Sequence, residues 1–108
     1  PQFFCGDFNT AQTDTFLYPI LINTLKAENG PLYSALQYTA DKLENDMNYD
    51  AKRQQPRNKR KVIDFIFYKP NGYEPRAMKR YVRQYKERWS THYQDLSDHN
   101  AVLMRLLL

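Results

Sequence analysis

The stretch VIDFIFY (residues 62–68) places β-branched and aromatic residues on both sides of one acid, and Pro70, Asn71 and Gly72 follow it. A short apolar run of this kind, ended by turn residues, predicts a central β-strand. Its acid, Asp64, is the informative residue, because burying a carboxylate among apolar side chains is unfavourable unless a partner pairs with it. The stretch therefore predicts a buried strand and a partner for Asp64.

Two more predicted strands carry polar residues at their ends. The first, QFFCGDF (residues 2–8), predicts a short buried strand that runs into a turn with Asp7 and Asn9. The last, AVLMRLL (residues 101–107), is preceded directly by Asp98 and His99. Strand ends position polar groups rigidly and leave one side open to a substrate. We therefore expect Asp7, Asn9, Asp64, Asp98 and His99 to converge at one end of a sheet.

His99 is the predicted partner of Asp64. A carboxylate that accepts a hydrogen bond from one imidazole nitrogen fixes the tautomer and makes the other nitrogen more basic. That arrangement suits a histidine that acts on a phosphate group.

Each motif taken alone also has a simpler interpretation. The Gly-Asp-Phe-Asn sequence can be a turn, Asp64 can cap a loop or pair with Arg57 or Arg60, and Ser97-Asp98-His99 can be a turn that enters a strand. His92 has no partner pattern and is interpreted as a loop residue. The joint occurrence of the three motifs, each at its own strand, favours a functional site.

The rest of the chain predicts further elements. Residues 13–26 have helical apolar spacing, with Thr13 or Asp14 as the N-cap, and residues 32–47 predict a second helix. Residues 48–61 predict an exposed loop. Residues 76–88 fit a helix face or an alternating strand.

Composition limits the class of protein. The 108 residues predict one domain, and the single cysteine, Cys5, excludes an internal disulfide. The formal charge of +4 comes from the tract KRQQPRNKRK (residues 52–61), which has six basic residues and no acid. The remaining residues carry ten Lys or Arg against 12 Asp or Glu, so a uniformly basic face for nucleic acid is not supported. The chain begins and ends in apolar stretches, which predicts a piece of a larger domain.

Together, CGDFN, VIDFIFY and LSDHNAV resemble the C-terminal half of the endonuclease/exonuclease/phosphatase (DNase I-like) superfamily, in family order and over nearly the whole chain. The resemblance implies an α/β fold, a four-layer sandwich with mixed β-sheets flanked by helices. Residues 1–108 would be the C-terminal part of one such domain, and its N-terminal half would be a partner. The family fold calls for a strand between the Asp64 strand and the final strand, so we predict a strand over residues 76–88.

The resemblance also implies roles for the polar residues. Asp7 would orient or deprotonate the attacking water, and Asn9 would help bind the phosphate and the metal shell. Asp64 would orient His99, and His99 would hydrogen-bond the phosphoryl oxygen as charge develops. Asp98 would belong to the carboxylates beside the metal, expected to be Mg²⁺. The family's metal-binding Glu precedes these motifs, so the chain alone is expected to lack a complete magnesium site.

The substrate remains open between classes of phosphodiester. The VIDFIFY and LSDHNAV stretches are most similar to the neutral sphingomyelinase-like branch, which implies a phospholipid head group as substrate. Residues 52–61 would then contact an anionic membrane surface. A nuclease would instead use this tract on a nucleic-acid backbone and the Tyr-rich segment 81–93 for stacking. A non-catalytic interaction module that retains the fold is the third alternative.

Overall fold

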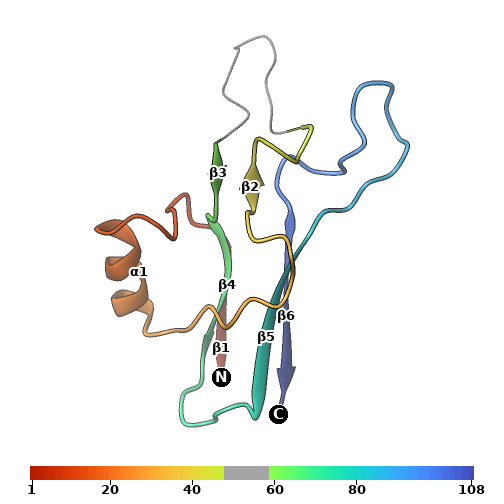
Figure 1. The fold of residues 1–108 in the computed structure, drawn as a ribbon. Helices are drawn as coiled ribbons and strands as arrows, with labels where there is room; N and C mark the ends of the chain where they lie inside the picture. The colour runs from red at the N-terminus through yellow and green to blue at the C-terminus, as the bar shows by residue number, and fades with distance from the viewer. Residues whose placement is uncertain (48–58) are drawn as a thin grey trace.

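The computed structural model describes residues 1–47 and 59–108. Along the chain it contains β1 (Gln2–Asp7), α1 (Leu17–Leu25), β2 (Ala40–Asp41), β3 (Arg60–Lys61), β4 (Asp64–Lys69), β5 (Ala77–Arg83) and β6 (Ala101–Leu107) (Figure 1). The three strands predicted at residues 2–8, 62–68 and 101–107 are confirmed as strands. The predicted burial of the first is wrong, because β1 is exposed at every residue except the half-buried Phe4. In the described residues, no helix is long and apolar enough to cross a membrane.

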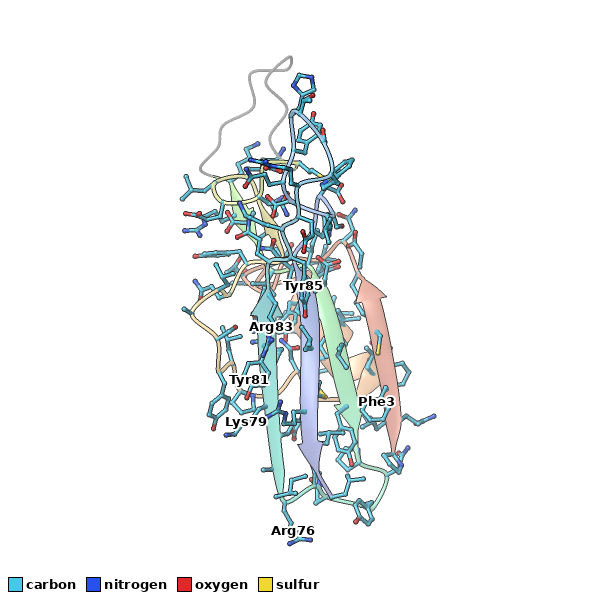
Figure 2. The ribbon with its side chains drawn as sticks, turned by 90° about the vertical axis from the view of Figure 1, so that its right-hand side faces the viewer. Phe3, Arg76, Lys79, Tyr81, Arg83 and Tyr85 are labelled. Carbon is cyan, nitrogen blue, oxygen red and sulfur yellow. The ribbon has the colours of Figure 1, made fainter. Side chains whose placement is uncertain are left out.

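The strands form three antiparallel ladders. β1 pairs with β4, β2 with β3, and β5 with β6. Figure 2 shows β5, β6, β4 and β1 side by side, with β6 next to β4, and the two long ladders contact each other through these two inner strands. β4 and β6 are nevertheless in separate ladders. Strand pairing alone therefore does not set where the start of β4 lies relative to the start of β6.

The core lies between the β1–β4 ladder and α1, which covers one face of it (Figure 1). Alternation along β4 points Phe65 and Phe67 to the same side, where both are buried and their rings stack at 4.9 Å. Tyr18 from α1 packs against Phe65, with ring centroids 5.6 Å apart. The apolar stretch that predicted a strand thus supplies the aromatic centre of the fold.

Asp14 fixes the start of α1. Its Oδ1 accepts hydrogen bonds from the backbone N–H groups of Phe16 (2.9 Å) and Leu17 (2.8 Å). These are among the N–H groups that a helix leaves unpaired in its first turn. The helix ends at Leu25, and the next residue, Lys26, has a left-handed φ of 51°. The helix predicted over residues 13–26 is therefore confirmed in a shorter form. Its N-cap position is Phe16 and not Thr13 or Asp14, and the Asp14 carboxylate acts from the preceding turn on the N–H groups at the helix start.

The second predicted helix, over residues 32–47, is wrong. Leu32 forms an isolated bridge with Arg80, and Ala40–Asp41 is the short strand β2. The physical reason is that neighbouring strands take the backbone hydrogen bonds of this segment. The Tyr33 N–H donates to the carbonyl of Arg80 at 2.8 Å. Tertiary pairing here overrides an apolar spacing that fits a helix.

Two other expectations are refined. The strand predicted over residues 76–88 is confirmed in a shorter form as β5, Ala77–Arg83. Among the named strands it pairs with β6 alone. The predicted loop 48–61 contains the short strand β3 at its end, and residues 48–58 lie outside the described residues.

The described residues contain both strands and a helix, but they do not form the expected four-layer α/β sandwich. The described residues form three small antiparallel ladders and one α-helix, rather than mixed sheets flanked by several helices. The ladder β5–β6 has no α-helix of the described chain packed on it as β1–β4 has (Figure 1).

Candidate functional site

Asp64 and His99 form a hydrogen-bonded pair at the start of two strands. Asp64 is the first residue of β4, and His99 lies two positions before β6. The His99 Nδ1 atom lies 2.8 Å from Asp64 Oδ2, and the two side chains are 27% and 18% exposed. The predicted contact is confirmed. Of the two alternative partners, Arg60 binds Asp41 instead, and Arg57 lies outside the described residues. Because Nδ1 faces the carboxylate, Nε2 is the nitrogen left for other chemistry.

Asp7 joins this pair through the β1–β4 ladder, in which it lies directly opposite Asp64. One potential ligand atom each from Asp7, Asp64 and His99 lies within 4.8 Å of the others. Three chain segments far apart in the sequence therefore meet at one end of the strands, as the sequence predicts for these three residues.

Asn9 lies in a tight turn next to Asp7. Its backbone N–H donates to Asp7 Oδ1 at 2.8 Å, and its φ is 47°, a left-handed value that Asn tolerates better than most residues. On the other side of Asp7, Gly6 has a φ of 146°, which L residues rarely adopt. The Gly-Asp-Phe-Asn sequence thus forms the turn that orients the Asp7 carboxylate.

Asp98 is not in the three-residue group found among the described residues. It is exposed and precedes His99 directly. Its role beside a metal, like the catalytic and substrate-binding roles of Asp7, Asn9, Asp64 and His99, stays a prediction.

The sequence analysis missed three buried polar residues behind the pair. Thr39, Asn45 and Asn100 are at most 4% exposed. Thr39 and Asn45 hydrogen-bond to the backbone near Asp64 and His99, and Asn100, the residue after His99, bonds to Thr39 and Asn45. Asn100 stands within the LSDHNAV motif, so its place next to His99 was a usable signal. Thr39 and Asn45 lie in the segment interpreted as a helix, where the sequence gives no such signal.

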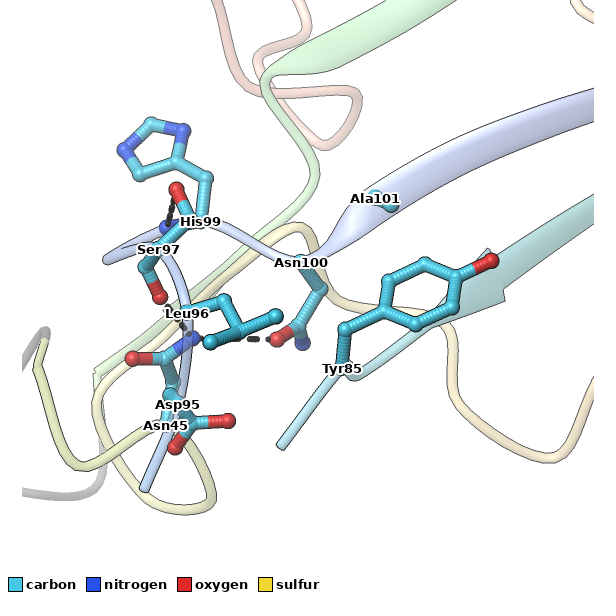
Figure 3. Close-up of a pocket in the computed structure, with 8 residues that line it drawn as sticks. All are labelled: Asn45, Tyr85, Asp95, Leu96, Ser97, His99, Asn100 and Ala101. Carbon is cyan, nitrogen blue, oxygen red and sulfur yellow. Dashed lines mark hydrogen bonds between the residues drawn. The ribbon is translucent and has the colours of Figure 1, made fainter. Parts of the chain in front are cut away.

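Two cavities open beside the pair. One of about 320 Å³ has His99 in its wall together with seven further residues (Figure 3), which are Asn45, Tyr85, Asp95, Leu96, Ser97, Asn100 and Ala101. The other, of about 280 Å³, is lined by both carboxylates of the group and by Cys5, Gly6, Phe65, Ile66, Asn100 and Val102. Since Asp64 and His99 line different cavities, the pair has open space on two sides.

The donor set partly fits a hard cation. The carboxylates of Asp7 and Asp64 offer the oxygen ligands that Mg²⁺ prefers, whereas imidazole suits softer metals. The hydrogen bond to Asp64 also occupies His99 Nδ1. The group is therefore closer to a histidine oriented by one carboxylate, with a second carboxylate beside it. It is less like a metal site closed by three protein ligands.

Comparison with known proteins finds similarity at the level of solved structures. No protein family model matches the chain, and no curated protein matches it. The crystal structure of beta toxin 275-280 from Staphylococcus aureus superposes with a TM-score of 0.77 at 21% identity, covering 95% of this chain and 36% of that chain. SmcL gives 0.72 at 25% identity, covering 97% and 38%. Sphingomyelinase C from Streptomyces griseocarneus gives 0.67 at 20% identity, covering 98% and 37%.

These similarities extend over nearly the whole of this chain and a little over a third of each solved structure. The chain thus shares its fold with part of beta toxin and of sphingomyelinases.

Proposed function

We propose that this chain is the C-terminal part of a metal-dependent phosphodiesterase that hydrolyses a phospholipid head group, as a sphingomyelinase does. The observation that carries the proposal is the 2.8 Å contact between His99 Nδ1 and Asp64 Oδ2, with Asp7 beside it. The structural similarity to sphingomyelinase C supports the choice of substrate class.

The proposed roles follow from the chemistry of each group. Asp64 fixes the orientation of the His99 ring by accepting from Nδ1–H, so that Nε2 faces the phosphate. In the imidazolium form, with a proton on each nitrogen, Nε2 donates a hydrogen bond as negative charge grows on a phosphoryl oxygen. Asp7 orients or deprotonates the attacking water, for which a carboxylate at a strand end with exposed oxygens is suited. Asn9 contributes polar groups to the phosphate from the adjacent turn.

Magnesium would bind through oxygen ligands. In this proposal the carboxylates of Asp7 and Asp98 contribute to its shell, and the remaining protein ligands come from the N-terminal half of the same domain. The bound cation would supply neutralisation of charge on the phosphate oxygens. The same N-terminal half would complete the four-layer sandwich.

The basic tract at residues 52–61 is proposed to contact an anionic membrane surface. Residues 52–58 lie outside the described residues. Arg60 binds Asp41 through two hydrogen bonds of 3.0 and 2.9 Å, so its guanidinium group has a structural role. Membrane contact is therefore assigned to the other basic residues of the tract.

The test is hydrolysis by the protein that contains this chain. We expect release of phosphocholine from sphingomyelin in the presence of Mg²⁺, loss of that release with a chelator, and no nicking of plasmid DNA. Asp98→Asn should raise the Mg²⁺ concentration required, and Asp7→Asn should also lower kcat at saturating Mg²⁺, whereas Glu74→Gln, an exposed acid outside the site, should change neither. Cleavage of DNA in place of the lipid would replace the substrate class. Absence of any Mg²⁺-dependent hydrolysis would leave the interaction module as the better interpretation.

A further inference from the structure

The relative placement of Asp64 and His99 is not explained by strand pairing. Asp64 belongs to the β1–β4 ladder and His99 leads into the β5–β6 ladder, and no ladder joins β4 to β6 among the described residues. A contact of 2.8 Å between side chains on two such units needs another element to fix one unit against the other.

Thr39 makes that connection. Its Oγ1 accepts hydrogen bonds from the backbone N–H groups of Ile63 (3.0 Å) and Asp64 (3.1 Å). Its backbone carbonyl accepts a hydrogen bond from the N–H of Asn100 at 2.7 Å. One residue, 0% exposed, thus binds the backbone of Asp64 and the backbone next to His99.

Asn100 reinforces the connection from the other side. Its Nδ2 donates to the carbonyl of Tyr38 at 2.8 Å, so two consecutive carbonyls of one segment bind its main chain and its side chain. Its Oδ1 accepts from Asn45 Nδ2 at 3.1 Å. The same Asn45 amide donates to the carbonyl of Ser97 at 2.9 Å, and Figure 3 shows both of these bonds. The backbone on each side of His99 is therefore fixed to residues 38–45.

We infer that Thr39, with Asn100, is a positioning residue that sets the geometry of the Asp64–His99 pair. The inference rests on the proposed function only where it predicts a rate. Loss of the Thr39 hydroxyl removes the acceptor for two N–H groups at the start of β4, that of Ile63 in a buried bond and that of Asp64 in a partly buried one, and the Asp64 carboxylate then shifts relative to the ring. Residues that orient metal ligands through hydrogen bonds typically affect activity by roughly 10- to 100-fold, and we expect an effect of that size for Thr39.

The test compares three substitutions in the protein that contains this chain. Thr39→Val is nearly isosteric and removes the acceptor, and Thr39→Ser restores it. Ser34→Ala is the matched control, because the Ser34 hydroxyl accepts from the backbone N–H of a strand in the same way, at 2.9 Å from Val82 N, and has no contact with the pair. We expect Thr39→Val to lower kcat by roughly 10- to 100-fold with KM little changed, and Thr39→Ser and Ser34→Ala to stay near the wild-type kcat.

A second readout does not depend on activity. Long-range ¹H–¹⁵N spectra report which ring nitrogen of His99 carries the proton, and His92 serves as an internal reference. We expect Thr39→Val to disturb the His99 pattern, and Thr39→Ser and Ser34→Ala to preserve it.

An unchanged kcat and an unchanged His99 pattern in folded Thr39→Val would overturn the inference. Equal loss of activity in Thr39→Val and Ser34→Ala would also overturn it, because general destabilisation would then explain both. If the wild-type protein hydrolyses no phosphodiester, the proposed function fails, and the His99 spectra still decide the positioning role.

Discussion

Asp64 and His99 stand 35 positions apart in sequence, and their side chains are joined at 2.8 Å across the boundary between two separate ladders. The geometry assigns Nδ1 to the carboxylate and leaves Nε2 for a ligand. Asp7 lies opposite Asp64 on the neighbouring strand. The candidate site is therefore a meeting point of strand ends, and its integrity depends on the turns and segments around them.

The first prediction concerns Gly6, which precedes Asp7 in β1. Gly6 has a φ of 146°, and an added Cβ would meet no atom within 4 Å, so the cost of Gly6→Ala is conformational and not steric. We expect Gly6→Ala to lower the free energy of unfolding by about 1–3 kcal/mol. Urea denaturation of the protein that contains this chain measures this change.

Cys5→Ala is the control for that substitution, because Cys5 is the exposed neighbour on the same strand. It should change the free energy of unfolding by less than about 0.5 kcal/mol. Equal stability of Gly6→Ala and Cys5→Ala would contradict the conformational role assigned to Gly6.

The second prediction concerns the ion pair between β2 and β3. Asp41 is 0% exposed, and its two oxygens accept from Arg60 Nε and one terminal guanidinium nitrogen. Hydrogen bonding to the Asp41 carboxylate is the main reason that the pKa of Arg60 is raised. Arg60→Met should destabilise the protein by about 1–3 kcal/mol, because it leaves a buried carboxylate without its cation.

Lys61→Met tests whether loss of any positive charge has the same effect. Lys61 is exposed and adjacent to Arg60 in β3. A melting temperature near wild type is expected for Lys61→Met and a clearly lower one for Arg60→Met. Indistinguishable melting curves for the two variants would refute the structural role of Arg60.

The third prediction is a pH dependence at the start of α1. Backbone hydrogen bonds from Leu17 and Phe16 lower the pKa of Asp14 below its ordinary value. A lowered pKa in the folded state means that the stabilisation is fully present above the ordinary Asp pKa and is lost as the pH falls through the folded value. We therefore expect Asp14→Ala to lower the melting temperature at neutral pH, with a smaller difference from wild type in strong acid.

Asp14→Asn separates the two parts of this effect. The amide keeps an oxygen that can accept from the same N–H groups but does not titrate in this range. The difference in melting temperature between wild type and Asp14→Asn should change with pH, because only the wild-type side chain titrates. The hydrogen bonds that the Asn amide oxygen accepts should not change with pH. A pH-independent difference between wild type and Asp14→Ala would contradict the assignment.

Much of the strand framework could be predicted from the sequence. The VIDFIFY stretch combined β-branched and aromatic residues with an acid that needed a partner, and the structure gives it both a ladder and His99. The strand ends and the pair were predictable because each depended on a local pattern next to a motif.

The segment 32–47 was not predictable by the same reasoning. Its apolar spacing fits a helix, but its backbone N–H and carbonyl groups bond to residues far away in sequence, such as Arg80 and Asn100. Thr39 functions through those long-range bonds and carries no local signature. Tertiary structure is therefore needed to find a positioning residue such as Thr39. Asp64 and His99, in contrast, could be predicted from the sequence.

The central claim is that His99 acts on a phosphate under the control of Asp64, and a double-mutant cycle on these two residues tests it most directly. Turnover on sphingomyelin should be measured for His99→Ala, Asp64→Asn and the double mutant in the protein that contains this chain. His92→Ala, a change of the other histidine in an exposed loop, is the control. We expect His99→Ala to lower kcat by roughly 100- to 1,000-fold with KM little changed. The double mutant should be little worse than His99→Ala, because the two residues act as one unit. Folded His99→Ala with turnover near that of wild type and of His92→Ala would contradict the account.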